Sequence, residues 1–180
     1  MINLRRLELA KHLRETARRL EKGATYRWTH QGQCNCGHLA QTLTGMASGD
    51  IHRLAVQSEG EWVDHAAAYC DTTGLPVDTL ITTMLSFGLT IDELGDLERL
   101  CSPRVTRWLP AAQNYLDYRR RTDVVLYFNT WAAVIEADVV MLETPNATVL
   151  VNGKLYTPYE ARTEVPLALD ENPASGKNAA

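Results

Sequence analysis

Long apolar stretches are scarce in this chain. The longest uncharged and mainly apolar run covers residues 124–135, far short of the roughly 20 residues with which a helix crosses a bilayer. No early apolar segment is followed by a small-residue cleavage site, as it would be in a secretory signal peptide. The sequence therefore predicts neither a membrane span nor secretion, and the expected location is the cytoplasm.

Cysteine is also sparse, with four residues in 180. Without an export signal, these cysteines should be reduced thiols rather than a disulfide framework. The chain has no Gly-rich phosphate loop and no dinucleotide-binding fingerprint. Its net charge of −4 indicates no general affinity for nucleic acid. The length and the 45% hydrophobic content suit one globular domain with a real core.

What the chain does have is helical periodicity over most of its length. Apolar residues recur at helical spacing in segments 3–22, 36–44, 50–56, 61–70, 76–87, 90–100 and 122–144. Asn152-Gly153 then separates two short apolar runs, which predicts a β-hairpin with a type I′ turn. We therefore predict a mostly α fold, a single-domain helical bundle of about six helices with a small C-terminal β-hairpin. This domain should cover residues 1–160, and the Pro-, Asn- and Ala-rich segment 166–180 should be a disordered tail.

Charge is distributed unevenly along the chain. Residues 1–22 hold seven Lys or Arg and three Glu, a net charge of +4, so the remainder carries −8. A basic helix on an acidic body can bind a protein partner, or it can simply present a solvated face. The two helices of residues 76–100 invite a helix-turn-helix interpretation, but the second is strongly acidic. A helix that reads a DNA groove should not repel phosphates, so no DNA binding is expected.

Reactive side chains concentrate in residues 26–41, which we call the cysteine segment. It reads Y-R-W-T-H-Q-G-Q-C-N-C-G-H-L-A-Q and holds two cysteines and two histidines within nine positions. Gly32 permits a turn, Asn35 is the expected N-cap of the following helix, and Gly45 is its expected end. A thiol in the first turn of a helix is stabilised as thiolate by the helix dipole. The pattern indicates cysteine chemistry.

One hypothesis is a metal site. Cysteine and histidine side chains are the usual ligands of zinc, and they also suit iron. We expect the helix of residues 61–70 to pack against that of 36–44 and to bring further ligands. The C-x-C spacing is tighter than that of most structural zinc sites, and burial alone explains any single one of these residues. The predicted ligands are Cys34, Cys36, His38, His65 and Cys70.

A second hypothesis is a thiol-dependent enzyme for acyl transfer or hydrolysis. Residues 31–43 resemble the active-site entry of papain-like cysteine peptidases and related acyltransferases, in which a Gln precedes a Cys that opens a helix. The resemblance implies Cys36 as the nucleophile and Gln31 or Gln33 as the oxyanion donor. No histidine follows His65, so His65 or a histidine before it would be the base.

The whole cysteine segment also resembles a group of short uncharacterised bacterial proteins with the signature Y-x-W-x-H…C-N-C-G-H-L-A-Q. This resemblance would extend to about residue 138. It implies a bacterial cytoplasmic protein and no particular activity. A third hypothesis therefore stands beside the metal site and the enzyme: a non-catalytic helical interaction module that binds a protein partner through its basic N-terminal helix.

Overall fold

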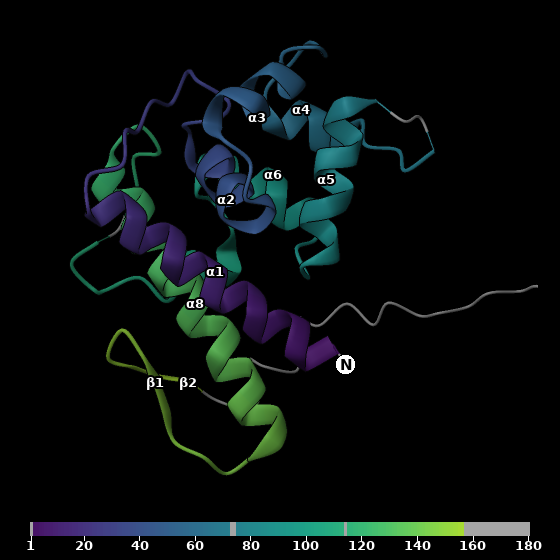
Figure 1. Cartoon of the computed structure of the whole chain (residues 1–180). Helices are drawn as coiled ribbons and strands as arrows, with labels where there is room; N and C mark the ends of the chain where they lie inside the picture. Colours follow the sequence, from purple (N-terminus) through teal and green to yellow (C-terminus); the bar gives the residue numbers. More distant parts are fainter. Residues whose placement is uncertain (1, 73–74, 114, 157–180) are drawn as a thin grey trace, which may run out of the picture.

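The protein consists mainly of helices (Figure 1). The computed structural model describes residues 2–72, 75–113 and 115–156, and within them it contains eight helices and one antiparallel hairpin. The mostly helical fold predicted from the sequence is confirmed, whereas the predicted tail of residues 166–180 lies outside the described residues. In chain order the elements are α1 (Ile2–Glu21), α2 (Asn35–Thr44), α3 (Ser48–Ala55), α4 (Trp62–Ala67), α5 (Pro76–Ser86), α6 (Ile91–Arg99), α7 (Pro103–Thr106), α8 (Arg121–Glu143), β1 (Val149–Val151) and β2 (Lys154–Tyr156).

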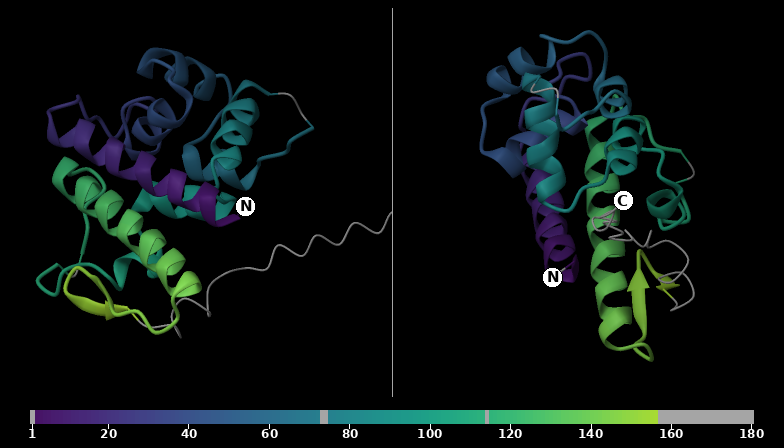
Figure 2. Two further views of the ribbon diagram at one scale, coloured as in Figure 1. Left: turned by 60° about the horizontal axis from the view of Figure 1, so that its bottom comes forward. Right: turned by 90° about the vertical axis from the view of Figure 1, so that its right-hand side faces the viewer.

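The first and the last helix form the largest helix–helix interface. Helices α1 and α8 lie side by side and run in opposite directions (Figures 1 and 2). Leu9 and Leu13 of α1 and Phe128 and Trp131 of α8 are fully buried between them and their neighbours. Helix α8 is long and apolar enough to cross a membrane by length and composition alone, but 67% of its most apolar window is buried inside the protein. Packing in the core accounts for its composition.

Helices α2 to α6 form a second group that covers the opposite side of α1 from the hairpin (Figure 1). Helix α2 packs on α1, α3, α5 and α6, whereas the main partner of α4 is α6. The expected packing of α4 on α2 is therefore not a main contact of this fold. Thr90 and Glu93 form the predicted capping box at the start of α6.

Two of the cations of α1 pair with acidic residues of other helices. Arg6 donates two hydrogen bonds to Glu93 of α6 at 2.8 and 2.6 Å, and Arg14 donates two to Glu136 of α8 at 2.8 and 2.6 Å. Bidentate pairs of this kind fix geometry as well as charge. The uneven charge distribution of the sequence thus describes a basic helix that packs on acidic neighbours. A protein partner for α1 stays a prediction.

The hairpin packs against α8 by one face (Figure 2). Its central residues Asn152 and Gly153 have φ values of 50° and 78°, as the predicted type I′ turn requires. Val151 and Tyr156 are buried against Trp108 and the end of α8. The Asn152 amide also donates to the carbonyl oxygen of Trp108 and to Thr130 Oγ1, both at 2.9 Å.

Candidate functional site

Cys34, not Asn35, is the N-cap of α2. The Cys34 sulfur accepts a hydrogen bond from the Gly37 backbone N–H at 3.4 Å, as a serine hydroxyl does at other helix starts. The predicted cap at Asn35 is therefore wrong by one residue. The Asn35 amide nitrogen instead donates to the carbonyl oxygens of Leu97 and Glu98 at 2.8 and 3.0 Å. It satisfies two of the carbonyls that the end of α6 leaves without helical partners.

Two glycines let the cysteine segment pack tightly at the start of α2 and against the start of α3. A Cβ atom at Gly37 would lie 2.2 Å from the Gln31 carbonyl oxygen, and one at Gly32 would lie 1.9 Å from the Ser48 carbonyl oxygen. No side chain fits at either distance without movement of the backbone. The Gln-Gly and Cys-Gly pairs of this segment therefore serve close packing of one backbone on another.

The two thiols of the cysteine segment lie inside the protein. Cys34 is 3% exposed and Cys36 is 0% exposed. Burial raises the pKa of Cys34 to about 12, and burial together with the charges of Cys34 and Glu98 raises the pKa of Cys36 well above its usual range. The helix dipole would favour a thiolate here, but loss of water outweighs it. Both thiols are protonated at neutral pH.

A buried carboxyl group completes this part of the structure. Glu98 Oε2 accepts a hydrogen bond from the Val63 backbone N–H at 2.7 Å, at the start of α4. Burial raises the pKa of Glu98. Trp62 donates from its ring nitrogen to the Gln31 carbonyl oxygen at 3.1 Å, which also accepts from the Cys34 thiol at 3.4 Å. These hydrogen bonds join α2, α4 and α6.

The predicted metal ligands have separate surroundings. The His38 Nε2 atom is 3.0 Å from the Thr25 carbonyl oxygen. His65 lies edge-on to Trp62, and the Cys70 sulfur is 3.1 Å from the Thr72 hydroxyl. Among the described residues, no group of three or more His, Cys, Asp or Glu side chains can hold a metal ion. The five residues are therefore not brought together as one ligand set. A zinc or iron site stays a prediction that no cluster of described side chains supports.

The residues implied by the peptidase resemblance also lie in surroundings that differ from one another. The Cys36 sulfur faces the Leu94 carbonyl oxygen at 3.9 Å in the core. The Gln31 amide nitrogen donates to the Gly60 carbonyl oxygen at 2.7 Å. His65 is on α4, where burial lowers its pKa. A buried, protonated Cys36 is poorly suited to nucleophilic attack, since the thiolate is the reactive form.

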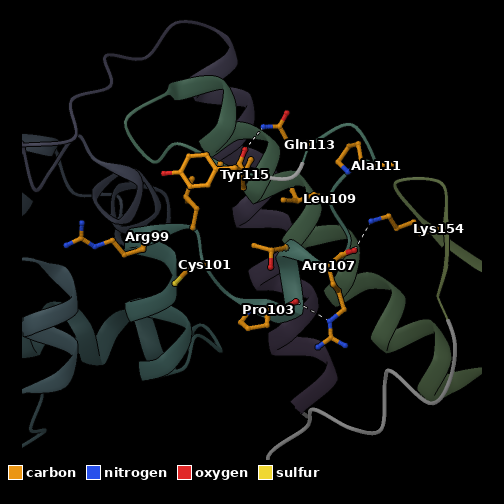
Figure 3. Close-up of a pocket in the computed structure, with 13 residues that line it drawn as sticks. Arg99, Cys101, Pro103, Arg107, Leu109, Ala111, Gln113, Tyr115 and Lys154 are labelled. Atoms are coloured by element: carbon orange, nitrogen blue, oxygen red, sulfur yellow. Dashed lines mark hydrogen bonds between the residues drawn. The ribbon is translucent and has the colours of Figure 1, made fainter.

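An open groove at the end of α6, which we call the groove, was not predicted from the sequence. Leu100 has a φ of 54°, an unusual value for a leucine, and it turns the chain sharply from α6 toward α7. The cavity has a volume of about 670 Å³. Figure 3 shows Arg99 and Cys101 on one side of it, Leu109 and Ala111 on the other, and Tyr115 above. Its lining residues are Arg99, Leu100, Cys101, Pro103, Thr106, Arg107, Leu109, Pro110, Ala111, Gln113, Tyr115, Leu116 and Lys154.

The groove combines an apolar interior with a basic rim. Leu109 and Leu116 are buried residues of its wall, whereas Tyr115 is 73% exposed. Arg107 and Lys154 contribute two cations, Arg99 lines the groove with its guanidinium turned away from it, and none of the described lining residues is acidic. The Lys154 ammonium donates to the Arg107 carbonyl oxygen at 2.8 Å, which ties the hairpin to this rim. An amphipathic anion has the matching chemistry.

No protein-family model, curated protein or solved structure matches this chain. The resemblances of the cysteine segment therefore stay predictions.

Proposed function

We propose that this protein is a non-catalytic binding protein whose groove holds a small amphipathic organic anion. The observation that carries the proposal is the 670 Å³ groove with Arg107 and Lys154 at its rim and no described acidic residue in its lining. Small-molecule sites typically have volumes of about 300–1,000 Å³ and a mainly apolar lining with a few polar groups. An apolar body against Leu109 and Leu116, with an anionic group at the rim, fits this arrangement.

The distribution of charge supports an anion in particular. The whole chain has a net charge of −4, so a rim with Arg107 and Lys154 and no described acidic residue differs in sign from the average surface. Arg and Lys cover apolar surface with their stems and keep their charged ends at the water boundary. An amphipathic anion places its charge at that boundary and its apolar part beneath it. The exposed ring of Tyr115 adds an aromatic surface at the mouth.

The condition of the cysteines supports a binding role over thiol chemistry. Cys34 and Cys36 are buried and protonated, and their partners join helices to one another. The exposed cysteine of the described residues, Cys101, lies in the groove, where its sulfur is 3.6 Å from Asp96 Oδ1. Burial and the Asp96 carboxylate raise the pKa of Cys101, so this thiol also lacks activation.

The test compares two fluorescent probes of similar shape, anilinonaphthalene sulfonate and the neutral phenylnaphthylamine. The wild-type protein should bind the anion more tightly than the neutral probe. The double variant Arg107→Gln/Lys154→Gln should weaken binding of the anionic probe about tenfold and leave the affinity for the neutral probe unchanged. It removes charge and little apolar area. The matched control is Lys11→Gln/Arg53→Gln, which removes two exposed cations from α1 and α3.

Cys101 gives a direct report of where the probe binds. Bound sulfonate should slow alkylation of Cys101 by N-ethylmaleimide and leave Cys70, outside the groove, unaffected. Equal affinity of the wild-type protein for both probes would show that the groove does not select anions. An equal loss of affinity for the anionic probe in the control variant would show the same.

A further inference from the structure

Arg99 contributes to the groove, yet its charged end lies outside it. The residue ends α6 and lines the groove, while its guanidinium points away from Leu109 and Tyr115 (Figure 3). Arg99 Nη2 is 2.9 Å from Glu61 Oε2. The guanidinium also lies over the rings of Trp28 and Tyr118, at 5.6 and 5.3 Å from their centroids.

We infer that Arg99 is the residue that selects the ligand: its guanidinium leaves Glu61 and turns into the groove to bind an oxyanion, a carboxylate, sulfonate or phosphate group, of the bound molecule. This inference rests on the proposed function. The planar guanidinium matches such oxyanions with two parallel hydrogen bonds, which an ammonium group cannot form. Arg99 would therefore distinguish an oxyanion from other negative groups at the rim.

The contacts that hold Arg99 outward are of a kind that exchanges easily. The side chains of Arg99 and Glu61 are 44% and 53% exposed. Exposed ion pairs and exposed cation–π contacts contribute little, because water competes for both partners. Tyr118 also keeps a cation without Arg99, since the Arg119 guanidinium lies 5.4 Å from the same ring. Departure of Arg99 thus leaves the second ring contact in place.

The same contacts supply an optical signal. Trp28 is half-buried and packs on Tyr118 with ring centroids 4.2 Å apart, and Arg99 is the cation over it. The other three tryptophans are buried. Octanoate, an amphipathic carboxylate that does not absorb tryptophan emission, should change the emission of Trp28 as Arg99 moves into the groove, and Trp28→Phe should abolish this change.

The decisive variants replace Glu61, which competes with the ligand for Arg99, and Arg99 itself. Glu61→Gln removes the charge that holds Arg99 outward, so it should tighten the binding of anilinonaphthalene sulfonate about fivefold. Glu59→Gln is the matched control, an exposed carboxylate two residues away, and should have no effect. Arg99→Gln should weaken binding about tenfold, and Arg99→Lys should not restore it.

A double-variant cycle separates this mechanism from a general change of charge. In the Arg99→Gln background, Glu61→Gln should no longer tighten binding, because its effect passes through Arg99. An equal effect of Glu61→Gln in both backgrounds, or an equal effect of Glu59→Gln, would overturn the inference and leave the groove as a binding site. Failure of the wild-type protein to prefer the anionic probe would overturn both proposals.

Discussion

The cysteine segment and the groove place similar side chains in opposite surroundings. The cysteine segment concentrates thiols and imidazoles in a short stretch of sequence, but the fold buries Cys34 and Cys36 among helices. The groove is lined by residues of α6, α7, the loop after α7 and β2, and it leaves Cys101 exposed. Burial decides the chemistry of a thiol more than the residues beside it in sequence do.

The cysteine segment acts as a structural junction. Cys34 caps α2, Asn35 caps the end of α6, and Glu98 accepts a hydrogen bond at the start of α4. Each of these polar groups replaces a hydrogen bond that the backbone lacks at a helix end. A dense set of polar and sulfur-containing residues is thus explained by three helix ends that meet in one place.

The largest expected difference between the two regions is in alkylation rate. At pH 8 and without denaturant, N-ethylmaleimide should modify Cys101 at least about 1,000-fold faster than Cys36, because Cys36 reacts only when the core opens. Quantitative mass spectrometry of the cysteine peptides gives both rates. The difference should disappear in concentrated urea. Rapid labelling of Cys36 in the folded protein would revive the thiol-enzyme hypothesis.

The second contrast is between an aromatic residue of the core and one of the groove. Trp131 is 2% exposed in α8, and Trp131→Ala should lower the free energy of unfolding by about 3–5 kcal/mol. Tyr115→Ala should change the free energy of unfolding by less than about 0.5 kcal/mol but weaken the binding of both fluorescent probes. The exposed ring contributes to binding and not to the core. Urea unfolding and probe titration measure the two effects. A stable Trp131→Ala protein would contradict the assignment of that residue to the core.

The third contrast uses one substitution at two helical glycines. Gly37→Ala should destabilise the protein by about 1–3 kcal/mol, since its Cβ would lie 2.2 Å from backbone of the cysteine segment. Gly95→Ala in α6 should be neutral or stabilise it by up to about 1 kcal/mol, because its Cβ meets only Val63 at 3.8 Å. Denaturant midpoints of the two variants provide the comparison. Equal midpoints would show that the cysteine segment packs less tightly than described.

The smallest expected effect is a dependence of stability on pH. Burial lowers the pKa of His30, His38 and His65, so the folded protein binds fewer protons than the unfolded chain. Stability is then complete above about pH 6.5, the unfolded value, and falls as the pH drops below it. The pKa of Glu98 is raised by burial, so that carboxyl opposes the trend.

The variant His65→Gln isolates one imidazole in this experiment. Unfolding free energies at pH 7.5 and 5.5 should differ less in the variant than in the wild-type protein. An equal difference would show that His65 does not contribute to the pH dependence.

Local patterns predicted most of the fold, whereas the site depended on distant contacts. Helical periodicity located the helices except the short α7, which has too few residues to show a period, and Asn152-Gly153 located the hairpin turn. The cap of α2 was misplaced because asparagine is the commoner cap and its amide is used by α6, 62 residues away in sequence. The groove was missed because its lining extends from Arg99 to Lys154 and its turn depends on the backbone of Leu100. No short window of sequence contains that information.

The pairing of α1 with α8 has a consequence for synthesis on the ribosome. About a hundred residues separate the end of α1 from the start of α8. At about 5–20 residues per second, α1 waits about 5–20 s for its largest partner, with Leu9, Leu13 and Leu20 uncovered on one face. Contacts between distant segments form late and slow the search for the native state. During that interval the nascent chain presents an apolar stripe to chaperones and to other unfinished chains.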